Sequence, residues 1–165
     1  MDRYFTDCHI PSGMVSGARF LIIRLRAFAH HTEVEGRVLK AMTFASGTED
    51  VAVTRTQGHF GNPIIVLDAE LKKAGDMKRF LNRVRDTVIL KGLAGQEDRR
   101  TDDDCIFHLR LDKQKAYQGE LALATGRDVI DVRIKVGVYP ARRGDAVRAV
   151  ADWISAADAA GPDNG

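Results

Sequence analysis

The sequence predicts an α+β fold, in which helices pack on one face of a mostly antiparallel, mixed β-sheet. Segments in which apolar and polar residues alternate take turns with segments in which apolar residues recur at helical spacing. Their order along the chain is β-α-β-β-α-β-β-α. Each expected strand also has one apolar face and one face bearing Arg or Lys, which is typical of a sheet with one side in water. A chain of 165 residues is long enough to bury a sizeable core.

Each element has its own local signal. The expected strands cover residues 20–29, 51–56, 64–71, 105–111 and 129–139, and the expected helices cover 32–47, 76–91 and 144–159. Thr32 and Glu35 have the spacing of a capping box, and Gly47 is suited to end the first helix. The second helix is strongly amphipathic, with Lys and Arg on its outer face. Pro140 ends the last strand.

The same spacings select the expected core. In the strands, the inward residues are Ile23, Leu25, Ala27, Val132, Ile134 and Val136. In the helices, they are Val34, Val38, Leu39, Met42, Met77, Phe80, Leu81, Val84, Val88, Val147, Val150 and Ile154. Trp153 is expected at the edge of the last helix, and residues 92–104 are expected to form a polar loop.

The ends of the chain lack any hydrophobic period. Residues 1–18 hold Pro, Ser and Gly and are expected to form a flexible N-terminal extension. Residues 161–165 are expected to be a disordered tail. The segment between them, 19–160, is expected to be a single domain.

The composition indicates where in the cell the protein is expected more clearly than it indicates its function. A net charge of +2 and a pI near 8.6 make the chain mildly basic, which only weakly indicates a nucleic-acid partner. Cys8 and Cys105 lie far apart and form no CxxC pair, as suits a reducing compartment. Arg24 and Arg26 interrupt the one long apolar stretch. We therefore expect neither a membrane span nor a signal peptide, and a cytoplasmic protein.

The segment 109–120 changes within two residues from a strand pattern to a dense polar run. That run brings Lys113, Gln114, Lys115 and Tyr117 close behind Arg110. Lys and Arg neutralise phosphate charge, and Gln and Tyr hydrogen-bond ribose or bases, so the run predicts a nucleic-acid contact. The alternative is a solvated turn that leads into a short helix.

The loop 57–63 carries two glycines around His59 and Phe60 and ends in Asn62 before a proline. At the tip of such a loop one ring can hydrogen-bond and the other can stack on a base. The alternative is a hairpin loop whose His and Phe pack back onto the protein.

Basic residues on the polar faces of the strands are expected to share an open sheet surface. They are Arg24, Arg26, Arg55, Arg110, Arg133 and Lys135. Acidic residues cluster elsewhere, at 102–104 and near the C-terminus, so positive charge can concentrate on this surface. The alternative is that these residues only keep a wet sheet face soluble.

Two motifs carry a family resemblance. The run GHFGNPI at 58–64 and the run LRLDKQ at 109–114, followed by Gly119 and Glu120, resemble the archaeal exosome-associated RNA-binding protein family. The run HHTE at 30–33 is similar to the family's helix entry, and the resemblance covers about residues 19–151. Gln57 stands where the family usually has Glu, and residues 1–18 have no counterpart.

The resemblance implies a fold similar to double-stranded-RNA-binding domains and to the ribosomal protein that binds five-S RNA. It also implies RNA binding as an accessory to RNA processing or degradation, with exosome or other RNA-processing proteins as partners. No cofactor, metal, membrane or small-molecule substrate is expected. The expected RNA contacts are His59, Phe60, Asn62, Arg110, Lys113, Gln114, Lys115, Tyr117, Arg24, Arg26, Arg133 and Lys135.

Three other functions are compatible with the residues. His30, His31, His59 and His108 with Lys113 contain the ingredients of a metal-independent ribonuclease, although nothing in their spacing forces them together. A metal site among Cys8, His9, His59 and Cys105 lacks a ligand pair with zinc-site spacing. The third alternative is a protein-interaction subunit that docks through the basic outer face of helix 76–91 without touching RNA.

Overall fold

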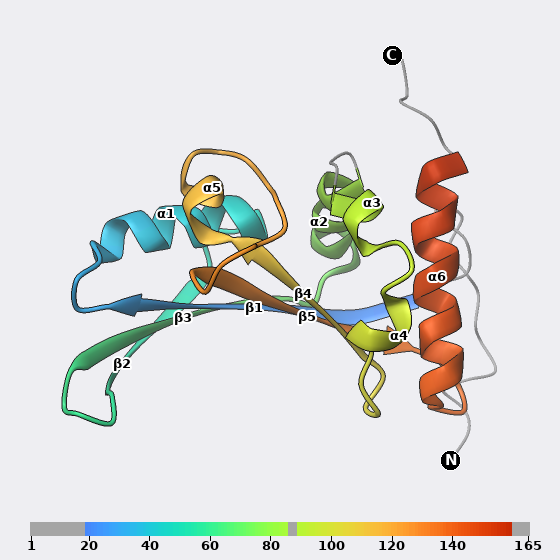
Figure 1. Cartoon of the computed structure of the whole chain (residues 1–165), viewed down its shortest axis with the longest axis horizontal. Helices are drawn as coiled ribbons and strands as arrows, with labels where there is room; N and C mark the ends of the chain where they lie inside the picture. Colours follow the sequence, from blue (N-terminus) through green and yellow to red (C-terminus); the bar gives the residue numbers. More distant parts are fainter. Residues whose placement is uncertain (1–18, 86–88, 160–165) are drawn as a thin grey trace.

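The computed structural model describes residues 19–85 and 89–159 and confirms the α+β fold. One five-stranded sheet has the order β2-β3-β1-β5-β4, and each of its strand pairs is antiparallel (Figure 1). The strands are β1 (Arg19–His30), β2 (Val51–Gln57), β3 (Pro63–Leu71), β4 (Ile106–Asp112) and β5 (Val129–Gly137). The expected extension 1–18 and tail 161–165 lie outside the described residues.

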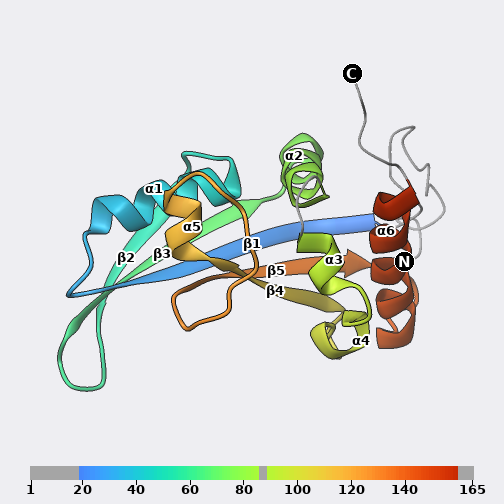
Figure 2. The ribbon, with the colours of Figure 1, turned by 45° about the horizontal axis from the view of Figure 1, so that its top comes forward.

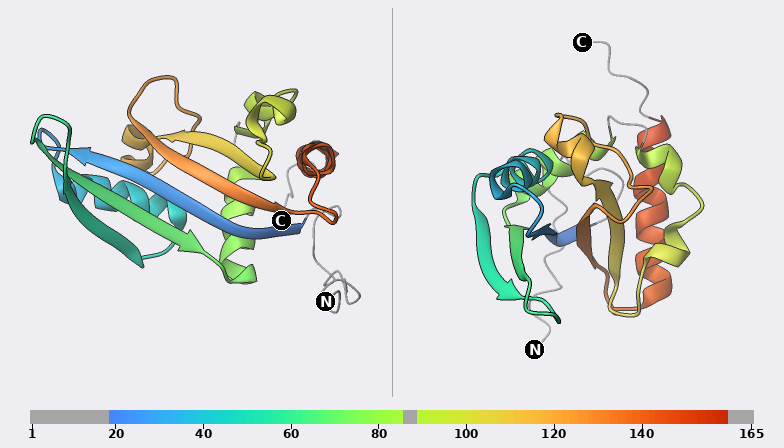
Figure 3. Two further views of the ribbon diagram at one scale, coloured as in Figure 1. Left: turned by 90° about the horizontal axis from the view of Figure 1, so that it is seen from below. Right: turned by 60° about the vertical axis from the view of Figure 1, so that its left-hand side comes forward.

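The helices gather on one side of this sheet. They are α1 (Glu35–Ser46), α2 (Ala74–Arg85), α3 (Ile89–Leu93), α4 (Glu97–Arg100), α5 (Lys113–Tyr117) and α6 (Arg143–Ala159). Helices α1, α5, α2 and α3 lie over one face, and α6 runs across one end of the sheet (Figure 2). Seen from below, the strands lie in front of α1 and α2, so no helix of residues 19–85 or 89–159 lies over the opposite face (Figure 3).

The alternation seen in the sequence sets the two faces. Ile23, Leu25 and Ala27 are fully buried under the helices, whereas Arg24 and Arg26 between them are exposed. Burial of the apolar side chains is the main favourable term for such a sheet, at roughly 25 cal/mol per Å² removed from water. The largest side chains of the core are Trp153, Phe80, Phe107, Ile23, Leu25, Met42, Leu67 and Leu71.

The start of α1 differs from the expected capping box. Val34 is the N-cap residue, makes no side-chain cap and is 60% exposed, so it does not belong to the core. Glu35 pairs instead with Arg55 of β2, at 2.9 Å. The end of the helix is as expected: Gly47 adopts φ 76°, and its N–H donates to the carbonyl of Thr43.

The second half of the chain is more helical than expected. The expected helix 76–91 corresponds to α2 and α3, with residues 86–88, and therefore Val88, outside the described part. The expected polar loop 92–104 contains α4. Trp153 is buried rather than at an edge, and its ring packs nearly perpendicular to that of Phe20, with 5.5 Å between centroids.

The outer edge of β4 is covered by the chain that follows α5. Asp112 N–H donates to the carbonyl of Ala122 at 2.8 Å, and Ala124 N–H donates to the carbonyl of Arg110 at 2.9 Å. Between these two bonds Leu111 forms a bridge with Leu123. This covering closes one margin of the sheet, and β2 forms the other.

Candidate nucleic-acid interface

The hairpin tip, residues 57–63, presents an aromatic ring to solvent. The N–H of Gly58 donates to the carbonyl of Asn62 at 2.7 Å, and the N–H of Gly61 donates to that of Gly58 at 2.9 Å. Gly61 has φ 76°, a conformation that a side chain would strain. Phe60 is 88% exposed, and the His59 ring meets it nearly perpendicularly, with 5.1 Å between centroids.

The end of β1 lies beside the hairpin tip. His30 pairs with Ile64 across the β1–β3 ladder, so the turn after β1 comes next to the loop. A pocket of about 380 Å³ forms here. It is lined by His30, His31, Thr32, Gly58, His59, Phe60, Asn62, Pro63 and Ile64. Three imidazoles and an amide thus border an apolar ring, a set that can donate to and accept from a base.

Lys113 is placed where it cannot reach a phosphate. The side chain is only 4% exposed, and its ammonium donates to the carbonyl of Phe28 at 2.8 Å. It also pairs with Glu33 at 2.8 Å and with Asp128 at 2.5 Å. Three oxygens therefore satisfy its three N–H groups, and the expected phosphate contact of Lys113 is replaced by a structural role.

Of the neighbours of Lys113, Gln114 and Tyr117 contact other side chains of the protein, whereas Lys115 is exposed to solvent. Gln114 donates to Asp128 at 2.6 Å, which helps to lower the pKa of that carboxyl: burial opposes the shift, and the hydrogen bonds from Lys113 and Gln114 overcome it. Tyr117 is partly buried, with the ammonium of Lys40 4.9 Å from its ring centroid. Lys115 is exposed, so it stays accessible to a ligand.

The two resemblance motifs lie on either side of the turn after β1. The hairpin tip borders the pocket described above, and Lys113, Gln114 and Tyr117 border another of about 230 Å³ with residues of α1. Thr32 lines both. The motifs are therefore neighbours through that turn, but they line two pockets rather than one shared cationic cradle.

The open face of the sheet mixes charges instead of being uniformly basic. Arg24 pairs with Glu70 at 2.8 Å, Arg26 with Asp68 at 2.6 Å and Arg133 with Asp131 at 3.1 Å. A depression of about 530 Å³ lies among these pairs. The hydrogen bond and charge of Asp68 raise the pKa of Arg26. The positive charge expected to be concentrated on this face is thus largely neutralised by neighbouring carboxylates.

Two further members of that expected set are also engaged. Lys135 donates to the carbonyl of Asp104. Arg55 lies on the helix-covered side, since its partner in the β3 ladder is Ile65, and it pairs with Glu35 of α1. The assignment of Arg55 to the open face is wrong because β2 places Ala52 and Thr54, not Arg55, beside Asp68 and Val66.

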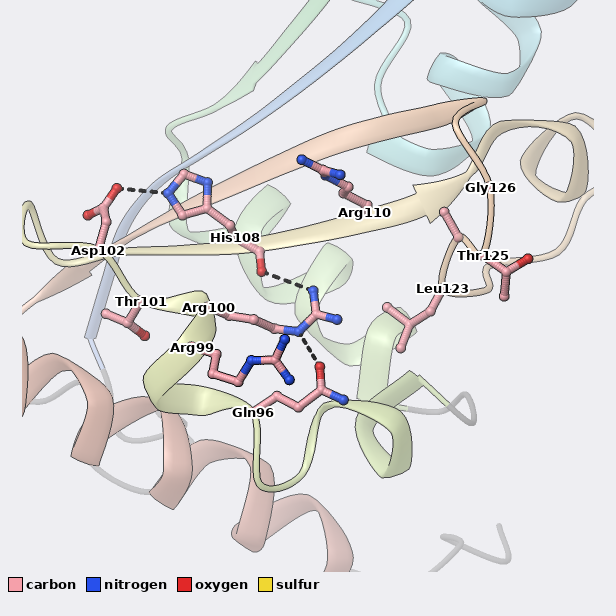
Figure 4. A pocket seen from close by; sticks show the side chains of 11 residues that line it. Gln96, Arg99, Arg100, Thr101, Asp102, His108, Arg110, Leu123, Thr125 and Gly126 are labelled. Atoms are coloured by element: carbon pink, nitrogen blue, oxygen red, sulfur yellow. Dashed lines mark hydrogen bonds and ion pairs between the residues drawn. The ribbon is translucent and has the colours of Figure 1, made fainter.

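An arginine pocket at the edge of β4 was not expected from the sequence. We use this name for a pocket of about 670 Å³ between α4, β4 and the loop 123–126 (Figure 4). Its lining comprises Gln96, Arg99, Arg100, Thr101, Asp102, His108, Arg110, Leu123, Ala124, Thr125 and Gly126. The adjacent Arg99 and Arg100 were the available signal, but only the fold brings them beside Arg110.

Hydrogen bonds hold the walls of the arginine pocket. Arg100 Nε donates to Gln96 Oε1 at 2.8 Å. Burial, and then the charges of Arg99 and Arg110, lower the pKa of Arg100. Asp102 lies 2.8 Å from His108 Nε2. Burial alone would raise the pKa of Asp102, but hydrogen bonds from His108 and two backbone N–H groups hold it below its usual range.

Two features of the described residues concern groups of metal-ligating side chains and helices long enough to span a membrane. Within 19–85 and 89–159, no three His, Cys, Asp or Glu side chains are grouped as a metal site would require. Cys105 is a buried free thiol, while Cys8 and His9 fall outside the described ranges. Of the helices in the same ranges, none combines the length and apolar character needed to cross a membrane.

The fold and these surfaces define a small α+β protein with an exposed aromatic hairpin tip and a sheet face over which the described part of the chain places no helix. A family model described as RNA binding matches residues 22–136. The chain belongs to this RNA-binding protein family.

Individual relatives agree with this assignment. The chain is 38% identical to RNA-binding protein PAB1135 of Pyrococcus abyssi, over 82% of this chain and 94% of the relative. Among solved structures it is similar to the DUF54 protein Mth689 of Methanothermobacter thermautotrophicus, with 28% identity and a TM-score of 0.70 over 82% of this chain and 98% of that one. The DUF54 protein AF2318 of Archaeglobus fulgidus is 30% identical, with a TM-score of 0.68 over 82% and 99%.

Proposed function

We propose that this protein binds RNA directly, without cleaving or modifying it, as an accessory to RNA processing or degradation. Family membership supports the class of ligand, and the name of the Pyrococcus abyssi relative supports it further. The single structural observation that carries the proposal is Phe60, a phenyl ring 88% exposed at a loop tip closed by its own backbone hydrogen bonds. So exposed an apolar ring gains almost nothing from burial in the protein itself and stays available for a ligand to cover.

The hairpin tip suits unpaired nucleotides. A base that stacks on an aromatic side chain gains roughly 1–3 kcal/mol, whatever its identity. His59 and Asn62 beside the ring supply donors and acceptors for a base edge. Bases in a duplex are stacked on one another, so the tip favours single strands, bulges and loops.

Cations that remain accessible would supply the phosphate contacts. Lys115 is exposed close to the turn after β1, and Arg110 is exposed on β4. Arg24, Arg26 and Arg133 could join only by giving up their carboxylate partners, so we expect them to contribute less.

The proposed partners include exosome or other RNA-processing proteins. Support comes from the motif resemblance, and the exposed Lys78 and Arg79 of α2 offer a basic surface on the helix-covered side. Docking through α2 without RNA contact is the alternative function. Binding of purified exosome that is lost in Lys78→Glu/Arg79→Glu, together with no detectable RNA binding by the wild-type protein, would favour that alternative.

The direct test compares Phe60→Ala with Tyr139→Ala, which removes another exposed aromatic ring. Titrations use labelled single-stranded, bulged and fully paired RNA. We expect Phe60→Ala to weaken binding to the first two by about tenfold, the equivalent of ~1.4 kcal/mol of stacking. Equal loss on all three RNAs, or an equal effect of Tyr139→Ala, contradicts stacking at the tip.

The same RNAs serve to test whether the protein cleaves RNA. Labelled RNA incubated with the protein should remain intact over the time of the titrations. Cleavage that disappears in His59→Ala would replace the non-enzymatic proposal with a ribonuclease, since His30, His31 and His59 border one pocket.

A further inference from the structure

We propose that the arginine pocket binds a phosphate group of RNA, an inference that rests on the proposed function and extends it beyond the hairpin tip. Arg99, Arg100 and Arg110 reach this pocket from α4 and β4 (Figure 4). The pocket lies toward the α6 end of the molecule, whereas the hairpin tip lies at the opposite end (Figures 1 and 2). An RNA strand that occupied both sites would run along the molecule.

Two of the three guanidinium groups have no acidic partner in the described part of the chain. No carboxylate of residues 19–85 or 89–159 lies within 4.0 Å of Arg99 or Arg110. Asp131 is opposite Arg110 in the β4–β5 ladder, but it pairs with Arg133. This contrasts with Arg24, Arg26 and Arg133 on the open face, which are all paired.

Arg100 is oriented by neutral groups, so its charge is not compensated. Its Nε donates to Gln96 Oε1 at 2.8 Å, and a terminal nitrogen contacts the carbonyl of His108 at 3.5 Å. A guanidinium stays protonated at any ordinary pH, so three like charges line one pocket. An anion between them would relieve their repulsion, and phosphate offers the oxygen geometry that guanidinium groups bind bidentately.

The one carboxylate in the lining is already engaged. Asp102 contacts His108 Nε2 at 2.8 Å and accepts from the N–H groups of Asp104 at 2.9 Å and Ile106 at 3.0 Å. These partners hold it in the turn before β4. It therefore fixes the position of His108 rather than pairing with the arginines.

The phosphate could be an internal diester or a terminal monoester, since both present the same oxygens. The double variant Arg99→Gln/Arg110→Gln tests the site, and Lys78→Gln/Arg79→Gln on α2 removes the same charge from the other side of the sheet. RNA affinity is measured as a function of salt concentration. For single-stranded RNA we expect the pocket variant to flatten the logarithmic slope by about 1.4, from ~0.7 per lost contact, and the α2 variant to leave it unchanged.

The source of the phosphate is resolved with one oligonucleotide in three forms: 5′-phosphorylated, 3′-phosphorylated and unphosphorylated. Preference for one phosphorylated end, lost in the pocket variant, assigns a terminal monoester. Equal weakening of all three forms assigns a backbone diester. Either result supports the pocket.

A second readout separates this inference from the proposed function. Inorganic pyrophosphate should shift the backbone amide resonances of residues 99–110 in wild-type protein and in Phe60→Ala, but not in the pocket variant. If wild-type protein binds RNA and the pocket variant matches it in affinity and salt slope, the pocket proposal is overturned while RNA binding stands. If wild-type protein binds no RNA, both proposals fail, whatever pyrophosphate does.

Discussion

The ammonium nitrogen of Lys113 lies 2.8 Å from the main-chain oxygen of Phe28, which precedes it by 85 positions in the chain. This bond ties the first turn of α5 to the far end of β1, and the pairs with Glu33 and Asp128 secure two more segments to the same nitrogen. The polar run after β4 therefore begins as a clamp between distant segments. Its capacity to bind a ligand rests on the residues that this clamp positions.

Replacing Lys113 by Met should destabilise the fold. Three oxygens would lose their donor, and removing one member of a fully buried ion pair costs about 3–5 kcal/mol. Because Asp128 is partly in water, we expect about 2 kcal/mol, measured by urea unfolding. Lys115→Met, two residues away on an exposed position, is the matched control and should change stability by less than about 0.5 kcal/mol.

Acid should weaken the same clamp. The pKa of Asp128 is lowered in the folded protein, so its contribution is complete above the unfolded value of about 3.8 and is lost as pH falls through the folded value. Stability of the wild-type protein should therefore fall more steeply below pH 4 than that of Lys113→Met. Parallel curves of unfolding free energy against pH would show that Asp128 does not carry this dependence.

In RNA binding, Lys115 should matter and Lys113 should not, which is the reverse of their expected effects on stability. Lys115→Gln should lower affinity and flatten the salt slope on single-stranded RNA by about 0.7, because one accessible cation is lost. Lys113→Gln should leave that slope unchanged in protein that is still folded, since its charge is buried. An unchanged slope for Lys115→Gln would remove α5 from the interface.

Trp153 should be a major contributor to the stability of the end of the sheet. It is 2% exposed and meets Phe20 edge to face. Trp153→Ala should cost about 3–5 kcal/mol, through lost burial and the cavity left behind. Val147→Ala on the same helix, at a partly buried position, should cost about 1 kcal/mol, and equal effects would contradict the buried placement of Trp153.

Gly47 offers a test of the end of α1. Its φ of 76° lies in the left-handed region, where a side chain costs roughly 1–2 kcal/mol. A Cβ here would also lie 3.3 Å from Arg83. Gly47→Ala should therefore lower the free energy of unfolding by at least about 1 kcal/mol, whereas Gly36→Ala inside α1, with open space around it, should be neutral or stabilising.

The sheet could be predicted because its signal is local. Alternation in β1 and β5 follows from the two faces of a strand, so Leu25 inside and Arg26 outside can be assigned from neighbouring residues alone. The expected capping box of Thr32 and Glu35 is absent, because Val34 is the N-cap residue and Glu35 pairs with Arg55 on β2. The pair of Glu35 with Arg55 joins two elements that meet only in the folded protein, so it cannot be predicted from the local sequence.

The candidate site was harder to predict because most of its side-chain contacts join segments that are distant in the sequence. Phe60 could be found because a short loop between two strands leaves its tip in solvent. The burial of Lys113 could not, since Lys in a polar run indicates exposure unless the acceptors of three remote segments are known. The arginine pocket likewise depends on three segments that meet only after folding.

The covered margin of β4 has a consequence for assembly. Residues 122–124 already use the peptide groups of Arg110 and Asp112 that would otherwise face outward. Among the residues that the structure describes, β2 is therefore the strand whose outer edge a strand of another polypeptide could extend. Any such augmentation would widen the sheet on the side of the hairpin and leave the covering of β4 by residues 122–124 in place.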